Sequence, residues 1–392
     1  MRASSFLGKL WLAHGQHTIT MGQGTYNAPC MKPAKRDTKQ VQMELDQVIR
    51  EIPKPNEAAR REAHARWARV AKPLGSLGEL ERMVERIAAA QGSADVAVEP
   101  RCVAVLCADN GVVAEGVTQT GPEVTAKVAE QLARGTSSAC VMAKAAHADV
   151  RAYDLGMLRE VAGVTPRKVA RGTRSIAQGP AMGTDDALAC IMAGVDIARE
   201  LAHAGYRVIA TGEMGIGNTT TASAVTCALL GMVPELAVGK GAGLDDAGLA
   251  RKVEAVRRAI AVNRADASDP VEVLAKLGGF DIAGMTGVFL GGALERVPVV
   301  VDGFISSVAA LVACRIAPAS RAFMLASHRS GEPAAAAVME ELGLSPVIDA
   351  GMRLGEGTGA VCLLPLLDMA CALYRNGMTF DEYNMDAYRE MP

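Results

Sequence analysis

The sequence has few aromatic side chains and almost no excess of charge. Aromatic residues make up 4% of the 392 positions, and 41 Lys and Arg stand against 43 Asp and Glu. The balance of charge gives no global field that would attract nucleic acid or an anionic membrane. The low aromatic content argues against stacking platforms for single-stranded nucleic acid. We therefore expect no nucleic acid among the partners.

Disulfide and metal-binding patterns are also missing. The nine cysteines include no Cys-x-x-Cys pair and mostly lie inside apolar segments, and the six histidines are scattered. This pattern predicts reduced cysteines in the core of a cytoplasmic protein. We expect no metal site, and no motif indicates a cofactor.

The sequence lacks a membrane-spanning pattern and a secretory signal. The longest apolar stretch, residues 360–374, contains Pro365 and Asp368, so we expect no membrane span. The first residues lack the charged start, apolar centre and cleavage site of a secretory signal. We interpret residues 1–40 as a disordered or non-native N-terminal extension.

Half of the residues are apolar, which is enough for one large α/β domain or two smaller ones. From residue 102 onwards, short apolar stretches alternate with helical patterns, which favours a mostly parallel sheet with helices on both faces. The predicted strands are 102–107, 149–153, 206–211, 297–301, 322–326 and 346–348. The predicted helices are 123–133, 136–147, 185–203, 219–230, 247–263, 303–314 and 333–341. Ligands of such sheets bind beyond the carboxyl ends of the strands, so the following loops are the expected site.

One glycine-rich loop, residues 212–220, follows a predicted strand and precedes a helix. It has neither the Walker A spacing nor the dinucleotide fingerprint. Either its N–H groups and the helix N-terminus bind a phosphate, or Asn218 or Thr219 caps a tight connection. Lys252, after a second glycine-rich loop, is either a phosphate ligand or a solvated helix charge. Ser330 either adds to an anion site or caps the next helix.

Three carboxylates, Glu213, Asp302 and Glu356, follow predicted strands. Glu356 stands between glycines before a long apolar segment. Either the helix dipole favours it in a first turn, or partial burial raises its pKa and suits it to proton abstraction. Phosphate-binding loops, a cation and carboxylates, without a Gly-x-Ser-x-Gly nucleophile, fit a transfer at a sugar carbon next to a phosphate.

A peripheral helical element precedes the sheet. Ser76 is predicted to cap the helix that follows it, with Glu79 completing a capping box.

Several blocks in this order resemble one family, the nicotinate-nucleotide:dimethylbenzimidazole phosphoribosyltransferases of cobamide lower-ligand activation. The blocks are residues 72–78, 109–117, 212–220, 241–245, 301–304, 327–330 and 353–359. The resemblance implies a Rossmann-like α/β domain over residues 99–360 and a homodimer. It also implies a small helical domain built from residues 41–98 and the C-terminal segment 361–392.

The resemblance also implies the reaction and its residues. Nicotinate mononucleotide would give its phosphoribosyl group to an aromatic base, with inversion at C1′, yielding an α-riboside 5′-phosphate and nicotinate. Glu356 would be the general base, Glu213 the second carboxylate and Asp302 an electrostatic group. The nucleotide-binding set would be Gly215, Gly217, Asn218, Thr219, Lys252, Ser330, Gly331 and Arg353. The base-binding set would be Ser76, Asp109, Asn110, Gln119 and Met214.

The sequence departs from the family pattern near the expected base site. Asn110 replaces the histidine of an Asp-His-Gly triplet, and residues 118–123 differ from the family segment after Val117. Benzimidazoles, adenine and a phenol therefore stay open as acceptors. A non-catalytic or partner-dependent subunit of a hetero-oligomer is the alternative function. The missing dinucleotide fingerprint argues against a third class, the dinucleotide-dependent oxidoreductases.

Overall fold

Six parallel strands form the central sheet, in the order β3-β2-β1-β4-β5-β6. The structure is a computed structural model that describes residues 37–388. The strands are β1 (Arg101–Ala108), β2 (Asp149–Gly156), β3 (Thr165–Pro166), β4 (Val208–Met214), β5 (Val299–Val301) and β6 (Met324–Ala326). Five of the predicted strands are confirmed. The sixth, 346–348, is reduced to a single bridge between His328 and Ile348.

Helices cover both faces of the sheet, as predicted. Side chains of β1 alternate between two apolar cores: Cys102, Ala104 and Leu106 lie in one, and Val103 and Val105 lie in the other. A strand that is buried on both faces needs apolar residues at every position, which β1 has after its first residue.

The first core is covered by α1 (Thr38–Glu51), α6 (Thr184–His203), α7 (Asn218–Leu230), α8 (Pro234–Ala237), α9 (Asp246–Asn263), α10 (Pro270–Leu277), α11 (Phe280–Leu294), α12 (Phe304–Ile316) and α13 (Ala335–Leu342). The second is covered by α2 (Glu57–Arg69), α3 (Glu79–Gln91), α4 (Glu123–Arg134), α5 (Ser138–Ala145) and α14 (Thr358–Asn376). Short 3-10 helices span Gly111–Glu115 and Pro318–Phe323.

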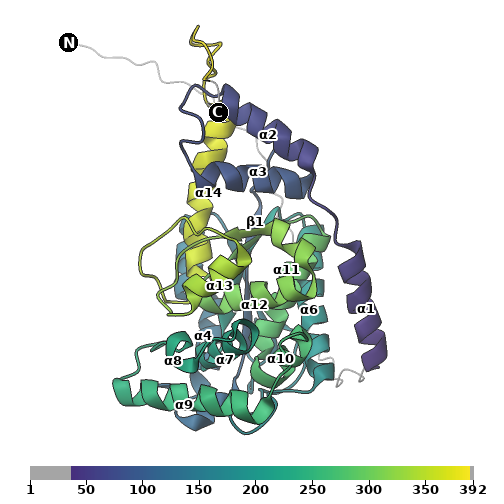
Figure 1. Cartoon of the computed structure of the whole chain (residues 1–392), viewed down its shortest axis with the longest axis vertical. Helices are drawn as coiled ribbons and strands as arrows, with labels where there is room; N and C mark the ends of the chain where they lie inside the picture. The colour runs from purple at the N-terminus through teal and green to yellow at the C-terminus, as the bar shows by residue number, and fades with distance from the viewer. Residues whose placement is uncertain (1–36, 389–392) are drawn as a thin grey trace, which may run out of the picture. The chain divides into compact units, whose positions relative to one another are not determined.

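Helices α2 and α3 meet the C-terminal helix α14 in a small helical part (Figure 1). Helices α2 and α3 pack on each other, and α3 packs on α14. The rings of Trp67 and Tyr374 lie 5.0 Å apart, and the Tyr374 hydroxyl donates to the Ala94 carbonyl at 2.8 Å. Arg101, almost completely buried, joins this part to β1 through a two-pronged ion pair with Asp368.

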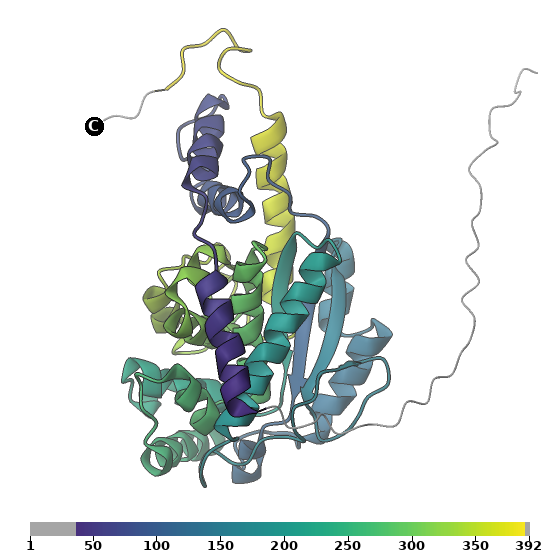
Figure 2. The same cartoon turned by 90° about the vertical axis from the view of Figure 1, so that its right-hand side faces the viewer.

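The structure places α1 differently from the predicted small domain. Figure 2 shows α1 alongside α6 rather than on α2 and α3, and it packs mainly on α6 and α11, two of the helices that cover the sheet. The predicted boundary between residues 360 and 361 falls inside α14, a continuous helix. Of the predicted extension, residues 1–36 lie outside the described residues, whereas α1 already begins at Thr38.

The cap predicted at Ser76 is wrong. Helix α3 begins at Glu79 with Gly78 as its N-cap, at a positive φ of 58°. Glu81 holds this turn in place: its carboxylate accepts hydrogen bonds from the Leu77 N–H at 2.8 Å and from Lys72 Nζ at 2.7 Å. A glycine at the N-cap therefore replaces the predicted capping box.

In the described part of the chain, α14 is the single helix long and apolar enough to cross a membrane, by length and composition alone. More than half of it is buried inside the protein, and Asp368 on it pairs with Arg101. Core helices of globular proteins pass the same test, so the finding is weak evidence for a membrane span.

Helices α6 and α11 pack unusually close through glycines. On α11, Gly284, Gly287 and Gly291 share one face because of their spacing. A Cβ at Gly287 would collide with the Ile191 carbonyl, and one at Gly194 on α6 would collide with the Gly284 carbonyl. This approach buries α11 against the sheet.

The Gly287→Ala variant should therefore lose about 3 kcal/mol of the free energy of unfolding, because two backbones must separate. Urea unfolding measures the loss. Gly183→Ala is the matched control: it precedes α6, its Cβ would meet nothing closer than 3.5 Å, and it should cost less than about 1 kcal/mol. Equal losses in both variants would contradict the close-packing argument.

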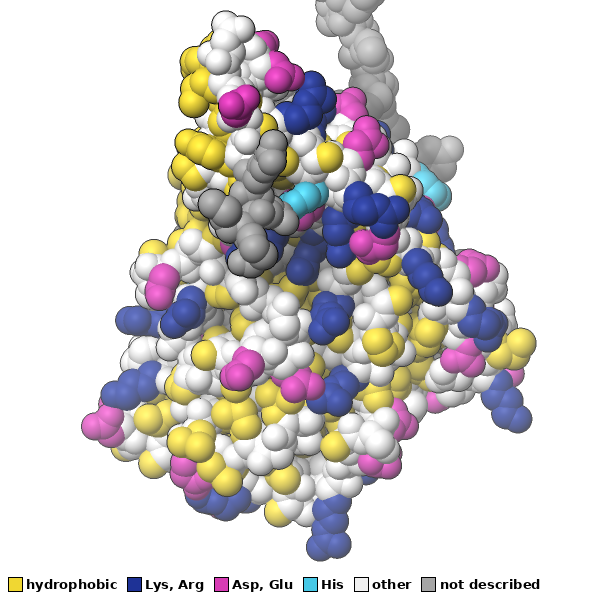
Figure 3. Space-filling view, turned by 45° about the horizontal axis from the view of Figure 1, so that its top comes forward, with side chains coloured by type: hydrophobic (Ala, Val, Ile, Leu, Met, Phe, Trp, Pro, Cys, Tyr) yellow, Lys and Arg dark blue, Asp and Glu magenta, His cyan; other side chains and the backbone are white. Residues whose placement is uncertain are grey.

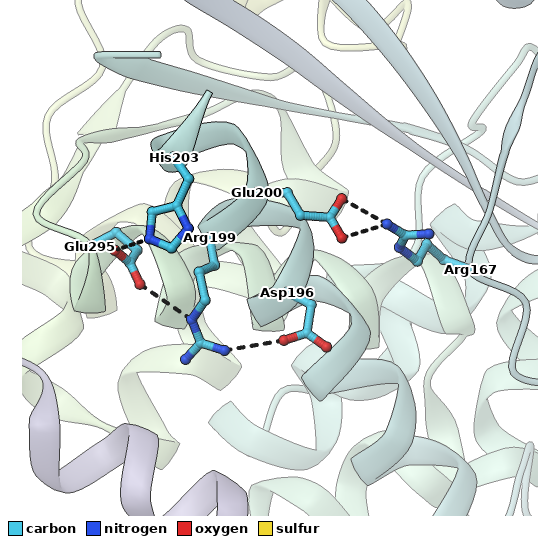
Figure 4. A network of polar contacts seen from close by, with 6 residues as sticks. All are labelled: Arg167, Asp196, Arg199, Glu200, His203 and Glu295. Atoms are coloured by element: carbon cyan, nitrogen blue, oxygen red, sulfur yellow. Dashed lines mark hydrogen bonds and ion pairs between the residues drawn. The ribbon is translucent and has the colours of Figure 1, made fainter. Parts of the chain in front are cut away.

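Ion pairs at the surface join the ends of these helices (Figure 4). Arg199 forms ion pairs with Asp196 and Glu295, and His203 lies 3.6 Å from Glu295. Arg167 donates two hydrogen bonds to the carboxylate of Glu200. Partly exposed pairs of this kind contribute little individually, roughly 0–1 kcal/mol. The ion pairs therefore add little to the contact between α6 and α11, which the glycines and the apolar side chains hold together.

Candidate active site

A cavity of about 310 Å³ lies at the carboxyl end of the sheet. The loops after β4, β5 and β6 line it, together with residues 117–120, 240–242, 244 and 353–356. This is the position where ligands of parallel α/β sheets bind. The strand-end loops chosen from the sequence thus converge on one cavity.

Glu356 belongs to a strained turn at this cavity. Its φ of 59° lies between those of Gly355 (89°) and Gly357 (86°). A left-handed conformation at a non-glycine residue costs energy and is often kept at functional sites. The side chain is partly buried, and Oε2 accepts the N–H of Ala139 at 3.2 Å, at the N-terminus of α5. Glu356 therefore lies before α14, and the alternative of a first-turn glutamate is wrong.

Glu213, the second-to-last residue of β4, lines the cavity and is 7% exposed. Its Oε2 accepts from Asn218 Nδ2 at the start of α7. Burial, and next the nearby Asp281 carboxylate, raise the pKa of Glu213 to about 8. Glu213 is therefore mostly protonated near neutral pH, unlike an ordinary glutamate.

Asp302 follows β5 and contacts the N-terminus of α14. Its Oδ1 accepts the Ala360 N–H at 2.8 Å, and its own N–H donates to Ser306 Oγ at 3.1 Å. Burial raises the pKa of Asp302, while nearby His328 and the backbone N–H donors oppose that shift. Asp302 thus lines the cavity and also caps the helix that follows Glu356.

Lys252 marks the cationic end of the cavity. It lies on α9, is 1% exposed, and its Nζ donates to Thr219 Oγ1 at 2.8 Å and to the Gly239 carbonyl at 3.0 Å. An ammonium group has three donors, so one remains for a ligand. Burial lowers the pKa of Lys252 to about 8. With the N-terminus of α7 beside it, this end of the cavity favours an anion.

Most of the predicted site residues line the cavity. From the catalytic and nucleotide-binding sets these are Glu213, Asp302, Glu356, Gly215, Gly217, Asn218, Thr219, Lys252, Ser330 and Arg353. Gly331 lies just outside, and its N–H donates to the Met352 carbonyl at 3.1 Å. Gly331 thereby joins the loop after β6 to the loop that carries Arg353.

Gly215 has a packing role besides the predicted approach to phosphate. A Cβ there would lie 2.5 Å from Asp281 Oδ2 and 2.6 Å from the Ala108 carbonyl. The glycine is needed because a buried carboxyl group lies directly beneath the loop.

Only two of the five residues in the predicted base-binding set line the cavity. Gln119 and Met214 line the cavity, and Gln119 Nε2 donates to the Gly243 carbonyl. Asp109 and Asn110 are buried beneath the cavity; Asp109 Oδ2 accepts the Leu158 N–H at 2.7 Å. Ser76 is exposed in the turn before α3 and does not line the cavity of this chain. Direct contact of Asp109, Asn110 and Ser76 with a base in this cavity is therefore not supported.

Sequence reasoning missed several lining residues and one buried partner. Apolar lining comes from Val117, Val128, Ile216, Leu244, Phe304, Ile305 and Leu354, with Thr118, Thr120 and His328 nearby. Except for Val128, which lies on α4, these residues lie in or beside the sequence motifs, and that position could have identified them. Asp281 carried none, because its helix was not predicted from the sequence.

Charged side chains of both signs are interspersed on the face shown in Figure 3. Between residues 37 and 388, no group of three or more His, Cys, Asp or Glu is placed to hold a metal ion. The cysteines from Cys102 to Cys371 are all free thiols. The cavity lining itself offers carboxyl groups, the buried ammonium of Lys252, further polar side chains such as His328 and Arg353, and backbone N–H groups.

Comparison with known proteins defines the class first. Residues 52–385 match the family model described as Phosphoribosyltransferase. This class agrees with a cavity that combines an anion site with carboxylates.

The relatives define the family further. The chain is 44% identical to the nicotinate-nucleotide–dimethylbenzimidazole phosphoribosyltransferase of Acetivibrio thermocellus, over 82% of this chain and 92% of that protein. The enzyme of the same name from Escherichia coli (strain SE11) is 41% identical, over 85% and 93%. A crystal structure of this enzyme from Thermus thermophilus is 39% identical, with a TM-score of 0.78 over 85% of this chain and 99% of that one. The chain belongs to the nicotinate-nucleotide–dimethylbenzimidazole phosphoribosyltransferase family, as the sequence blocks predicted.

Proposed function

We propose that this enzyme transfers the phosphoribosyl group of nicotinate mononucleotide to an aromatic base of the benzimidazole class. The products are an α-riboside 5′-phosphate, a precursor of a cobamide lower ligand, and nicotinate. One observation carries the proposal: Glu356 and the buried Lys252 lie on the same cavity. A general base and a phosphate site are the two groups that this reaction needs.

The proposed step is a single displacement. One ring nitrogen of the base forms a bond to C1′ of the ribose while the bond from C1′ to the nicotinate nitrogen breaks. The other ring nitrogen of the base gives its proton to Glu356, and nicotinate leaves with the electron pair of the broken bond. Attack from the opposite face inverts C1′ and needs no covalent enzyme intermediate. Lys252 and the N-terminus of α7 hold the phosphate, and Asp302 adds negative charge near the developing positive charge.

The lining of the cavity supports a flat, largely apolar acceptor. Val117, Val128, Ile216 and Leu244 provide apolar surface, and Gln119 provides a polar amide close to them. A benzimidazole buries two fused rings and still offers one N–H to Glu356. Adenine adds polar groups that need partners on such a surface, and a phenol would form an ether-type bond instead.

A competition among dimethylbenzimidazole, adenine and phenol tests the acceptor. We expect the purified chain alone to release nicotinate and to form the benzimidazole riboside phosphate as its main product, identified by mass. Equal use of phenol would contradict the benzimidazole assignment. Absence of nicotinate release with every acceptor would favour the partner-dependent subunit of a hetero-oligomer.

We also propose a homodimer that uses the exposed side of α14. Met369 is 60% exposed and Leu373 36% exposed, four residues apart on one helix face. Exposed apolar side chains on one face favour association with a second apolar surface.

The double variant Met369→Lys with Leu373→Lys should shift the sedimenting species from dimer towards monomer. The control, Leu236→Lys on α8, replaces a side chain of similar exposure (64%) on another helix. It should leave the sedimentation coefficient unchanged. A dimer that survives the double variant would exclude this face.

A further inference from the structure

A second buried carboxyl group lies directly behind Glu213. Asp281, in the first turn of α11, is fully buried and does not line the cavity. The Nδ2 group of Asn218 donates both to Glu213 Oε2 and to Asp281 Oδ2, the latter at 3.0 Å. Two carboxylates this close and this dry are costly to ionise together. The pair therefore holds one proton and one negative charge near neutral pH.

The hydrogen bonds assign the charge to Asp281. Its Oδ2 also accepts from Asn110 Nδ2 at 3.4 Å, and its Oδ1 accepts the Ile282 N–H at 3.0 Å. The Ile282 N–H lies at the N-terminus of α11, where a negative charge is favoured. In the described part of the chain, Glu213 accepts one hydrogen bond, from Asn218. Burial raises the pKa of both groups, that of Asp281 to about 6 and that of Glu213 to about 8.

The geometry also indicates which oxygen of Glu213 carries the proton. Because Oε2 accepts from Asn218, the proton is carried by Oε1. Oε1 lies next to Gly355, where a Cβ would be 2.7 Å from it, and Gly355 lines the cavity beside Glu356. The reverse orientation of the Asn218 amide would put a carbonyl oxygen between two carboxyl groups. The O–H of Glu213 thus points to the side of the cavity that carries Glu356.

We propose that Asp281 is a positioning residue: its negative charge, held beside Glu213 by the Asn218 amide that contacts both groups, keeps Glu213 protonated, so that Glu213 donates a hydrogen bond from Oε1 to an uncharged oxygen of the ribosyl substrate. The identity of that substrate rests on the proposed function. Glu213 keeps its proton throughout the transfer. The proton of the attacking base then goes to Glu356, and a protonated Glu213 does not compete for it.

Other charged and titratable groups also face Glu213. Asp302 after β5 and Glu356 before α14 both raise its pKa, and the thiol of Cys107 on β1 lies close to it. Lys252 on α9 and His328 after β6 line the same cavity. Of the three charges of Asp281, Asp302 and Glu356, that of Asp281 raises the pKa of Glu213 the most. An Asp281 variant therefore removes the largest charge effect on Glu213 and leaves the other two in place.

Infrared difference spectroscopy of the full chain, without substrate, tests the proton directly. The wild-type protein should show a protonated carboxyl band at pH 7 that titrates away near pH 8 and is absent in Glu213→Gln. In Asp281→Asn the same band should disappear at least about one pH unit lower, because a neighbouring negative charge is lost. A missing band in the wild type, or an unshifted band in Asp281→Asn, would overturn the proposal.

Two further variants serve as controls, one for the loss of any buried carboxylate and one in case Asp281→Asn does not fold. Asp154→Asn also removes a buried carboxylate, on β2 beside Lys168, but it does not line the cavity and should leave the Glu213 band in place. If Asp281→Asn does not fold, Asn218→Ala tests the amide link that contacts both carboxyl groups. It removes the hydrogen bond that lowers the pKa of Glu213, so the band should persist to higher pH, and an unshifted band would contradict the link.

The pH dependence of kcat/KM gives an independent readout. Above about pH 8 both Glu213 and Lys252 lose protons, so activity should fall with a two-proton slope. Glu213→Gln keeps an N–H donor at the position of Oε1, so it should lose less activity than Glu213→Ala, and its slope should fall to one proton. An equal loss in both variants would mean that Glu213 acts as an ionised group. The infrared result does not depend on turnover, so failure of the proposed reaction and failure of this inference can be told apart.

Discussion

Glu356→Gln should lower kcat by about 10²–10⁴-fold, the usual cost of a lost general base, while the fold and nucleotide binding stay nearly intact. Glutamine has the same shape but cannot take the proton of the attacking base. The Oε2 position that accepts the Ala139 N–H can still be filled by the amide oxygen, so the strained turn should hold. Steady-state release of nicotinate measures kcat, and calorimetry with the nucleotide measures binding.

The matched control for this variant is Asp349→Asn. Asp349 lies a few residues earlier in the same loop, pairs with Arg329 at the surface and does not line the cavity. The same carboxylate-to-amide change should alter kcat less than about twofold, since an exposed pair contributes little. An unchanged kcat in Glu356→Gln would remove Glu356 from the role of base, and equal losses in both variants would point to damage to the loop.

Lys252→Ala should weaken binding of the nucleotide by about 10–100-fold, the cost of a hydrogen bond to a charged group. The effect should be confined to ligands that carry the phosphate, because Lys252 lies at the anion end of the cavity, held by Thr219 and the Gly239 carbonyl. The phosphate-free nucleoside should bind equally to both proteins. Titration calorimetry with the two ligands measures the difference.

The pH dependence of binding offers a second check on Lys252. Its pKa is lowered to about 8, so its positive charge is present below that pH and lost above it. Affinity of the wild type for the nucleotide should therefore fall as the pH rises through about 8, and Lys252→Ala should lack this fall.

Lys240→Ala is the comparison for this variant. Lys240 also lines the cavity, but its ammonium is half-exposed and pairs with Asp246. Its loss should weaken nucleotide binding several-fold less than the loss of Lys252, because solvent screens exposed charges. Equal loss of nucleotide and nucleoside affinity in Lys252→Ala would contradict a phosphate contact.

Local pattern was enough for the elements that flank the site. The strands β1, β2, β4, β5 and β6 were predictable because a buried parallel strand is a short apolar stretch bounded by turn residues. The loop after β4 and the Glu356 loop were recognisable because their glycines and carboxylates are adjacent in the chain. Most of the cavity lining followed, since the ends of parallel strands converge.

Helix α11 was not predictable in the same way. It is apolar on every side and carries four glycines, Gly284, Gly287, Gly291 and Gly292, so it lacks both an amphipathic period and high helix propensity. Only complete burial between the sheet and α6 makes it a stable helix. Asp281 was missed together with it, because nothing in the local sequence separates a buried polar partner from a helix-start aspartate.

The Glu356 loop also shows which features the sequence determines and which only the tertiary structure decides. The order of the sequence blocks determined the family, the alternation of apolar and helical stretches predicted the parallel sheet, and the loop motifs supplied the residues that we propose as general base and anion site, because all of these depend on adjacent residues. The tertiary structure decided that Glu356 reaches α5 instead of its own helix, that Asn110 lies beneath the cavity, and that Asp281 and Glu213 share the Asn218 amide as a hydrogen-bond donor. Those facts depend on burial and on contacts between segments more than sixty residues apart, which local patterns do not contain.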